Sequence, residues 1–312
     1  MPPKVSFITP SFNQGRFIQR TIESILSQDM SDSEYVVMDG GSTDETVEIL
    51  KQYEDRLRWV SEKDDGQTHA INKGLQATNG EIIGWLNSDD IYYPGAVRAA
   101  YEFLQANEQI DIVYGDATYI DEEDGITDLY PTEPWNFRRL KDSCFICQPG
   151  AFFRRRVVER FGLLDERINF CMDYEYWLRS ASAGARFAYL PRVLAGSRMY
   201  PTNKTLGFTE IFHVEILDMM RRLFGQVPDR WLLNYAHTVL KNRGVEGINP
   251  FSFALGLARV AHDAALRWNG QVPPSIQLQL KEAEAGLDAA QQRIAQYQAH
   301  MSIERGVDAS ST

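Results

Sequence analysis

Two adjacent carboxylates, Asp89 and Asp90, end a run of strand-forming residues in the segment EIIGWLNSDD (81–90). Like charges side by side repel each other, and near an apolar core neither is stable without a positive partner. A hard divalent cation can be that partner, because Mg²⁺ and Mn²⁺ are commonly held by one or two carboxylates while substrate phosphates and water complete the coordination. The pair therefore predicts a Mg²⁺ or Mn²⁺ site that serves a phosphate-bearing ligand.

Three other strand-like runs also end in polar or acidic residues: TPSFN (9–13), DGGSTD (39–44) and SEKDDGQ (61–67). In an open parallel sheet, ligands bind beyond the carboxyl ends of the strands. Each segment alone is compatible with a turn, a helix cap or a loop, but turns do not require acid at every strand end. Together with the acidic pair they indicate one ligand-binding edge, where a cation offsets the repulsion between an acidic protein and a diphosphate.

The strands that deliver these residues alternate with amphipathic helical stretches over the first 116 residues. Runs of β-branched and aromatic residues predict strands over 5–9, 34–38, 57–61, 81–86 and 111–115, and helical periodicity predicts helices over 16–28, 43–53, 68–77 and 95–107. This order is typical of an α/β fold with a mostly parallel, Rossmann-like sheet flanked by helices. Ser42 and Glu45 have the spacing of a capping box for the second helix.

After residue 116 the alternation stops. DEEDG (121–125) is predicted to be the turn of a hairpin rather than a calcium loop, because the EF-hand spacing and its final Glu are missing. Helices are expected over 155–161 and 174–183, with the loop GLLDERINFCMD (162–173) between them. From residue 209 the chain is almost wholly helical, and its last helix, about 276–300, has the composition of a solvated extension or a weak coiled coil.

Composition restricts the class of protein. The chain has 312 residues, of which 44% are hydrophobic, and its 43 acidic and 32 basic residues give a net charge of −11, which disfavours nucleic acid as a partner. Neither a signal-peptide pattern nor an apolar run of membrane-spanning length is found, so we expect no transmembrane segment and a cytoplasmic location, with peripheral contact at the inner face of the membrane left open.

The three cysteines, Cys144, Cys147 and Cys171, include one C-x-x-C. A zinc site usually needs four nitrogen or sulfur ligands, so they are interpreted as reduced structural thiols.

Four segments together resemble the family 2 glycosyltransferases, a family of inverting enzymes with a GT-A fold: VSFITPSFNQGRFIQRTIESILSQ (5–28), DGGSTDETVEIL (39–50), DGQTHAINKGLQATNGEIIGWLNSDD (65–90) and QPGAFFRR (148–155). The resemblance covers about residues 5–205. It implies a GT-A domain over 1–205, with a donor half (1–116) and an acceptor half (117–205). A helical region (206–275) and an extended helix or tail (276–312), forming a coiled coil or partly disordered, would follow it.

The resemblance also implies roles for residues at the sheet edge. Thr9, Pro10 and Ser11 would line the base and ribose pocket, and Asp39 would accept a hydrogen bond from the base. Asp64 and Gly66 would belong to a loop that closes over the nucleoside, with Asn72 and Lys73 nearby. Asp90 would be a metal ligand, and Asp89 would lie near the ribose or the metal.

On the acceptor side, MDYEYWLR (172–179) resembles the family's acidic motif, which implies that Asp173 is the general base, with Glu175 the next candidate. Two positions depart from the family pattern, since Met172 stands where Glu is usual and Tyr200 where many relatives have His. Tyr200 could hydrogen-bond a phosphate of the diphosphate. Arg198 and Lys204 would then neutralise its charge, or else be loop residues that carry surface charge.

The function that this resemblance implies is metal-dependent transfer of a sugar, with inversion, from a UDP-, dTDP- or GDP-sugar to a hydroxyl of a saccharide or lipid-linked saccharide acceptor, in surface polysaccharide or glycoconjugate synthesis. Two alternatives are a nucleotide-sugar-binding protein without activity and a sugar nucleotidyltransferase. The second would need a glycine-rich, basic loop after the first strand, which TPSFNQGRF (9–17) is not. The last helix could also join subunits into an oligomer.

Overall fold

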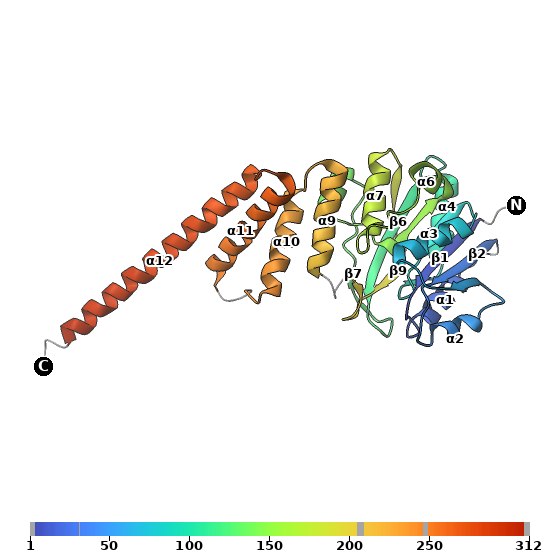
Figure 1. Cartoon of the computed structure of the whole chain (residues 1–312), viewed down its shortest axis with the longest axis horizontal. Coiled ribbons are helices and arrows are strands. Elements are labelled where there is room, and N and C mark those ends of the chain that lie inside the picture. The colour runs from blue at the N-terminus through green and yellow to red at the C-terminus, as the bar shows by residue number, and fades with distance from the viewer. Residues whose placement is uncertain (1–3, 31, 205–208, 246–248, 309–312) are drawn as a thin grey trace. The chain divides into compact units, whose positions relative to one another are not determined.

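The computed structural model describes residues 4–30, 32–204, 209–245 and 249–308, with side chains described up to residue 298 (Figure 1). It divides into two compact units, residues 1–207 and residues 208–312. This boundary lies two residues after the one expected at 205. The predicted tail includes residues 309–312, which lie outside the described residues. None of the described helices has an apolar stretch long enough to cross a membrane.

The first unit is built on one mixed sheet. Among the described residues its strands have the order β3-β2-β1-β4-β8-β6-β9-β5, and β7 pairs with β6. The strands are β1 Val5–Ser11, β2 Ser33–Asp39, β3 Arg58–Ser61, β4 Ile82–Trp85, β5 Ile91–Tyr92, β6 Ile112–Ile120, β7 Ile126–Leu129, β8 Ala151–Arg154 and β9 Phe187–Arg198. The helices of this unit are α1 Ile18–Leu26, α2 Thr46–Lys51, α3 Gln67–Ala77, α4 Ala96–Ala106, α5 Phe137–Asp142, α6 Arg155–Phe161 and α7 Met172–Ser182, with a short 3₁₀ turn at Gln148–Gly150.

The predicted α/β class is confirmed, and parallel pairs occur in two parts of the sheet, β3-β2-β1-β4 in the donor half and β6-β9 further along. β1 pairs in parallel with β2 and β4, and β2 with β3. Beyond β4 the sheet changes character, because β8 is antiparallel to both β4 and β6. The strand predicted over 111–115 is present as part of β6, but β8 lies between it and β4 in the sheet. The hairpin predicted at 121–125 is confirmed by the antiparallel pairing of β6 with β7.

Alternating side chains of β1 face two different layers of helices. Val5 and Phe7 belong to a buried cluster with α1 and α4, which includes Ile22 and Leu104. Ile8 points to the other face, where it meets α3 at Gly74. The sheet is thus covered on both sides in the donor half, as its continuous apolar strands require.

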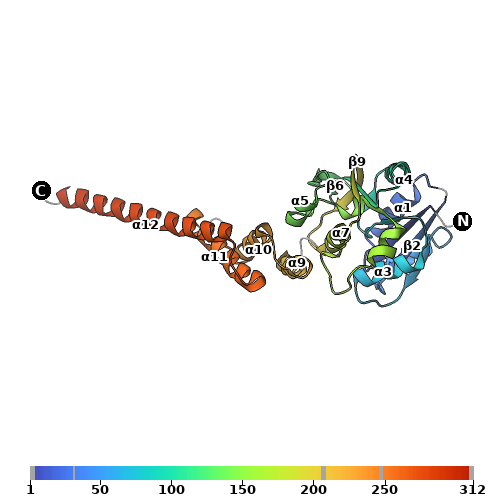
Figure 2. The ribbon, with the colours of Figure 1, turned by 90° about the horizontal axis from the view of Figure 1, so that it is seen from above.

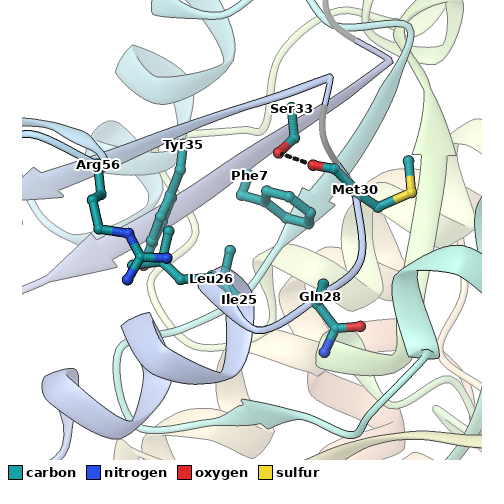
Figure 3. A pocket seen from close by; sticks show the side chains of 8 residues that line it. All are labelled: Phe7, Ile25, Leu26, Gln28, Met30, Ser33, Tyr35 and Arg56. Atoms are coloured by element: carbon teal, nitrogen blue, oxygen red, sulfur yellow. Dashed lines mark hydrogen bonds between the residues drawn. The ribbon is translucent and has the colours of Figure 1, made fainter.

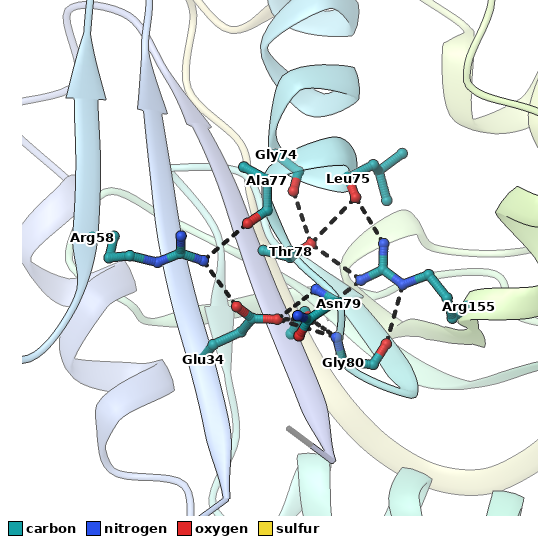
Figure 4. A network of polar contacts seen from close by, with 10 residues as sticks. Glu34, Arg58, Gly74, Leu75, Ala77, Thr78, Asn79, Gly80 and Arg155 are labelled. Carbon is teal, nitrogen blue, oxygen red and sulfur yellow. Dashed lines mark hydrogen bonds and ion pairs between the residues drawn. The ribbon is translucent and has the colours of Figure 1, made fainter. Parts of the chain in front are cut away.

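The amino ends of the strands are held by a polar network around Glu34 and Arg155 (Figure 4). The Glu34 carboxylate accepts hydrogen bonds from the Ser6 hydroxyl at 2.7 Å and from the backbone N–H groups of Asn79 at 2.7 Å and Gly80 at 3.1 Å. Arg155 donates to the Gly80 and Leu75 carbonyls at 3.1 and 2.7 Å. These bonds fix the turn between α3 and β4, and so set where β4 ends at the opposite edge.

A cavity of about 240 Å³ also lies toward this amino edge (Figure 3). Its lining combines apolar side chains with a few polar ones: Phe7, Ile25, Leu26, Gln28, Met30, Ser33, Tyr35 and Arg56. The residues expected at the carboxyl ends of the strands do not line it, so the cavity is separate from the edge at which the sequence predicts the ligand.

The second unit is helical, as predicted, with α9 Thr209–Phe224, α10 Asp229–Asn242, α11 Pro250–Asn269 and α12 Pro274–Asp308 (Figure 2). Asn249 caps α11 by accepting from the N–H groups of Phe251 and Ser252, and Pro250 occupies the first turn. Ile276, near the start of α12, is fully buried together with Ala236 and Ala261. α12 therefore begins inside the core of this unit.

Gly74 in α3 has no room for a side chain, because a Cβ atom there would lie 2.4 Å from Cγ2 of Ile8. Gly74→Ala gains about 1 kcal/mol of helix propensity, but the overlap should outweigh it and lower the free energy of unfolding by about 1–3 kcal/mol. Gly286→Ala in α12 is the control, since its Cβ would lie 3.5 Å from Phe251 and should stabilise its helix. Urea unfolding followed by circular dichroism measures both changes. A more stable Gly74→Ala protein would contradict the prediction.

Candidate active site

The carboxyl ends of three neighbouring strands lie at one level of the sheet. Ser11, the last residue of β1, is paired with Asp39, the last residue of β2, and Asp39 is paired with Ser61, the last residue of β3. Ile8 is paired with Trp85, so the segment after β4 leaves the sheet at the same edge. The structure therefore brings together the four polar segments that the sequence predicts to converge.

Asp39 is buried, and its carboxylate organises the loop that follows it. It accepts hydrogen bonds from the N–H groups of Gly41 and Ser42 at 3.2 and 2.9 Å and from the hydroxyls of Ser42 and Ser61. Three of these four bonds go to Oδ2, so Oδ1 keeps an acceptor position beyond the Ser42 hydroxyl. This is where a hydrogen bond from a ligand can be accepted.

The predicted capping box is wrong, because the Ser42 hydroxyl is used by Asp39 and α2 begins at Thr46. Asp44 takes over at this helix start, where it accepts from the N–H and the hydroxyl of Thr46 at 3.1 and 2.6 Å. The same carboxylate accepts from the N–H of Gly15 at 2.9 Å. It therefore ties the loop after β1 to the loop after β2.

The end of β1 carries a buried hydroxyl that lacks a partner. Thr9 is hydrogen-bonded to the Tyr35 hydroxyl at 3.1 Å, but the Ser11 Oγ atom, two residues further along and beyond Pro10, has no hydrogen-bond partner within the described part of the chain. Buried polar atoms are usually satisfied, and an exception at a strand end beside Asp39 is what a ligand pocket produces.

The loop after β3 folds back against the loop after β2. The Asp64 carboxylate accepts from the N–H of Gly66 at 2.9 Å, and a Cβ atom at Gly40 would lie 2.9 Å from that carboxylate. Gly66 has φ +106°, a left-handed conformation that a residue with a side chain rarely adopts, and it directly precedes α3. Asp64 and Gly66 thus lie beside Asp39, as expected of a loop near the nucleoside.

The side chains of Asn72 and Lys73 bind other residues of the protein. Asn72 is buried in α3 and exchanges two hydrogen bonds of 3.0 Å with the backbone of Leu164, and Lys73 forms an ion pair with Glu62. Asn72 therefore holds the segment that leads to α7 against α3, which positions the acceptor half against the donor half.

The two carboxylates after β4 have different surroundings. Asp90 is 4% exposed, and its Oδ1 accepts from the backbone N–H of Arg198 at 2.8 Å, while Asp89 is half-buried and its Oδ2 accepts from the Tyr200 hydroxyl at 2.9 Å. Burial raises the pKa of both carboxyls, and the neighbouring charge of Asp89 raises the pKa of Asp90 further. Such a pair is stabilised by a bound cation.

A polar cluster beneath this pair was not predicted. The Asn87 Oδ1 accepts from the Trp85 indole and from the Gln67 amide, both at 2.9 Å, and its amide donates to Gln148 at 3.0 Å. Gln148 in turn donates to the Trp85 carbonyl at 2.6 Å. The QPG segment was among those that carried the resemblance, so this was the signal by which Gln148 could have been found.

The donor set fits a hard divalent cation that is shared with a ligand. Within the described residues no group of three or more His, Cys, Asp or Glu side chains could hold a metal by itself. Asp89 and Asp90 supply carboxylate oxygens, which suits Mg²⁺ or Mn²⁺ when phosphate oxygens and water provide the other ligands. Cys147 and Cys171 are buried, Cys144 is partly buried, and none of the three forms a disulfide within the described residues.

Asp173 lies in the first turn of α7, which begins at Met172, two residues earlier than predicted. Burial raises the pKa of its carboxyl to about 6. Burial also raises the pKa of the Cys147 thiol, and the charges of Asp90 and Asp173 raise it further. The segment that precedes α7 is held against the start of α3, because the Thr68 hydroxyl donates to the Ile168 carbonyl at 2.7 Å.

The two basic residues of this region have different surroundings. Arg198 is the last residue of β9 and its side chain is fully buried in an ion pair with Asp124, so the alternative that it is a loop residue with surface charge is wrong. Lys204 donates to the Asn169 carbonyl at 3.1 Å and is exposed.

A mixed sheet with a parallel nucleotide-binding half, an acidic pair after β4 and a carboxylate at the start of α7 defines a GT-A-type glycosyltransferase. Residues 6–162 match the family model described as Glycosyl transferase family 2, and the chain belongs to this family. Chondroitin synthase of Escherichia coli is 28% identical over 207 residues, which cover 65% of this chain and 30% of that protein. An uncharacterized glycosyltransferase of Rickettsia prowazekii is 26% identical over 216 residues, covering 65% of this chain and 66% of that protein.

Solved structures have the same fold. The 1–349 segment of S. aureus TarS in complex with UDP-GlcNAc has a TM-score of 0.61 at 16% identity, covering 90% of this chain and 87% of that one. A mannosyltransferase from Pyrobaculum calidifontis in complex with GDP-Man and Mn²⁺ has a TM-score of 0.55 at 19% identity, covering 94% and 76%. The chain spans less than two thirds of the length of the two curated relatives.

Glu175, the reserve candidate for the base, is buried and its carboxylate accepts two hydrogen bonds from Arg179 at 2.8 and 3.2 Å. Glu175→Gln should therefore lower the free energy of unfolding by about 1–3 kcal/mol, because donors of Arg179 lose charged acceptors in the interior. Glu62→Gln, which breaks the exposed pair with Lys73, should leave the urea midpoint unchanged. Equal midpoints for the two variants would argue that Glu175 has no structural role.

Proposed function

We propose that the protein transfers a sugar, with inversion, from a UDP-, dTDP- or GDP-sugar to a hydroxyl group of a saccharide or lipid-linked saccharide. The observation that supports this proposal is that a family 2 glycosyltransferase carries an acidic pair where the chain leaves β4 and a carboxylate, Asp173, in the first turn of α7, after a segment that is hydrogen-bonded to α3. One carboxylate belongs to the donor half and the other to the acceptor half. A displacement reaction needs both, one beside the leaving group and one beside the nucleophile.

The chemistry follows from the positions of these groups. Asp173 takes the proton of the acceptor hydroxyl while the oxygen of that hydroxyl forms a bond to the anomeric carbon. At the same time the bond from the anomeric carbon to the diphosphate oxygen breaks. When Mg²⁺ or Mn²⁺ is bound by Asp89 and Asp90, it supplies positive charge for the departing diphosphate. Ser11, Asp39 and Asp64 hold the nucleoside at the ends of β1, β2 and β3.

Surface polysaccharide or glycoconjugate synthesis is the context that we propose for this transfer. The similarity to chondroitin synthase, a protein named for polysaccharide synthesis, supports it at the level of reaction type. A nucleotidyltransferase would release pyrophosphate, whereas glycosyl transfer releases a nucleoside diphosphate, so product analysis distinguishes these two activities.

Asp90→Ala and Asp173→Asn should separate donor binding from chemistry. Asp90 acts on the diphosphate in the ground state and the transition state, so its loss should weaken metal-dependent donor binding and abolish turnover together. Asp173→Asn keeps the shape of the side chain and should spare donor affinity, while the transfer rate falls by about two to four orders of magnitude. Calorimetric titration with UDP-, dTDP- and GDP-sugars in Mn²⁺, together with an assay for nucleoside diphosphate release, measures both effects. If Asp173→Asn retained more than about a tenth of the wild-type rate, the base would lie elsewhere.

The pH dependence of transfer should follow the ionisation of Asp173. Because burial raises the pKa of this carboxyl to about 6 and a general base acts only when ionised, the rate at saturating donor and Mn²⁺ should fall as the pH drops through that value. Below about pH 5 the decline should approach tenfold per pH unit. The residual rate of Asp173→Asn, measured over the same range, should lack this step. A wild-type rate that stayed constant down to about pH 4.5 would exclude Asp173 as the titrating base.

A further inference from the structure

Arg198 is a cation with a fully buried side chain, at the end of β9 and next to the acidic pair. A buried guanidinium is stable only when its N–H groups meet acceptors. With no exposed side-chain surface, it also has no free face to offer a diphosphate. Its role must therefore be sought in the protein groups that it contacts.

Arg198 contacts both members of the acidic pair from the same side. Its backbone N–H donates to Oδ1 of Asp90 at 2.8 Å, and its Nε donates to the backbone carbonyl of Asp89 at 2.7 Å. The first bond fixes the rotation of the Asp90 carboxylate, and the second fixes the backbone that carries Asp89. The segment Asn87–Asp90, here called the metal loop, is thus held through one residue.

The other arms of the guanidinium reach the hairpin turn, residues 121–125. Nη1 donates to the Asp121 carbonyl, and Nη2 forms an ion pair with the Asp124 carboxylate. The turn is itself well ordered by hydrogen bonds, because the Asp121 carboxylate accepts from the N–H groups of Glu123 and Gly125 at 2.9 and 2.7 Å. Arg198 therefore joins the metal loop to a stiff element that is remote in sequence.

A third element, α1, contacts both the hairpin turn and the metal loop. Arg20 of α1 pairs with Asp124 at 3.1 Å, and Thr21 of α1 donates to the Asp90 carbonyl at 2.7 Å. The guanidinium of Arg198 also lies over the ring of Phe17, 4.9 Å from its centre. The metal loop is held between α1 and the hairpin turn, with Arg198 in the middle.

We propose that Arg198 is a positioning residue for the metal loop, and that the hairpin turn is the support against which it acts. This inference rests on the proposed function, because the geometry of Asp89 and Asp90 matters for catalysis only if they hold a cation. Arginine suits the task because its planar fork reaches acceptors in three fixed directions, whereas lysine has a single nitrogen. Residues that orient metal ligands from behind typically change metal affinity by about 10–100-fold when they are removed.

The test is the affinity for Mn²⁺ alone, measured by water proton relaxation, alongside the urea midpoint of each variant. Arg198→Met should weaken Mn²⁺ binding by about 10–100-fold, and Arg198→Lys by about tenfold or more despite its retained charge. Arg20→Met is the matched control, since Arg20 pairs with the same Asp124 but makes no described hydrogen bond or ion pair with the metal loop. It should bind Mn²⁺ within about twofold of the wild-type value.

Asp124→Asn keeps the inference testable if the Arg198 variants fail to fold. Asp124 is 33% exposed and has φ +70°, a conformation that Asn also tolerates, so this variant should fold. It removes the charge that anchors the fork and should weaken Mn²⁺ binding by about threefold or more.

Three results would overturn the inference. A folded Arg198→Met protein with wild-type Mn²⁺ affinity would do so, as would full rescue by Arg198→Lys, which would assign the effect to charge alone. Unchanged affinity in Asp124→Asn would remove the support role of the hairpin turn.

The proposed function fails separately. A wild-type protein that binds no Mn²⁺ and releases no nucleoside diphosphate would refute it, and with it the inference. If the wild-type protein binds Mn²⁺ and the Arg198 variants bind it with the same affinity, only the inference is refuted.

Discussion

Placing two adjacent carboxylates at the end of a buried strand is the constraint on which much of this fold depends. Neither Asp89 nor Asp90 can lose its water without receiving hydrogen bonds from the protein. Those bonds come from three separate places: the backbone N–H of Arg198, the hydroxyl of Tyr200 and the amide of Asn87. The mixed part of the sheet can be understood as the structure that delivers these donors. The parallel half alone could form the nucleotide edge, but it could not keep the acidic pair in place.

Local patterns in the sequence predicted the donor half well. β1, β2 and α3 lie within one or two residues of their predicted bounds, because the apolar pattern that marks a buried strand or an amphipathic helix lies within the element itself. β5 was missed because two residues are too few to show a period. β8 is as short as β3 and β4, but it runs directly into α6, so that no turn residues mark its end. β9 was missed because Pro191 interrupts it, and its pairing with β6 is irregular on either side of Asp116.

The site was predictable only in part, because contacts between residues that lie far apart in the chain leave no local pattern in the sequence. Polar or acidic residues at four strand ends indicated the ligand edge, and the motif around Asp173 gave the candidate base. The donors to each carboxylate could not be identified from the sequence, since Arg198 and Tyr200 lie more than a hundred residues from Asp90 and Asp89. The motif placed Asp173 ahead of Glu175 as the base, and the structure adds that Arg179, one turn further along the helix, binds the Glu175 carboxylate.

The order of strands in the sheet has a consequence for synthesis of the chain on the ribosome. β8 is inserted between β4 and β6, although β6 is made about forty residues earlier than β8. While β8 is still inside the exit tunnel, the free edge of β4 is exposed and β6 is already available as a strand. A parallel pairing of β6 with β4 would mimic a simple Rossmann sheet and would have to be undone later. β8 can end this competition only once it has emerged together with Arg154, Arg155 and Arg156, which anchor its carboxyl end at the amino edge through Glu81, the Leu75 carbonyl and Asp111.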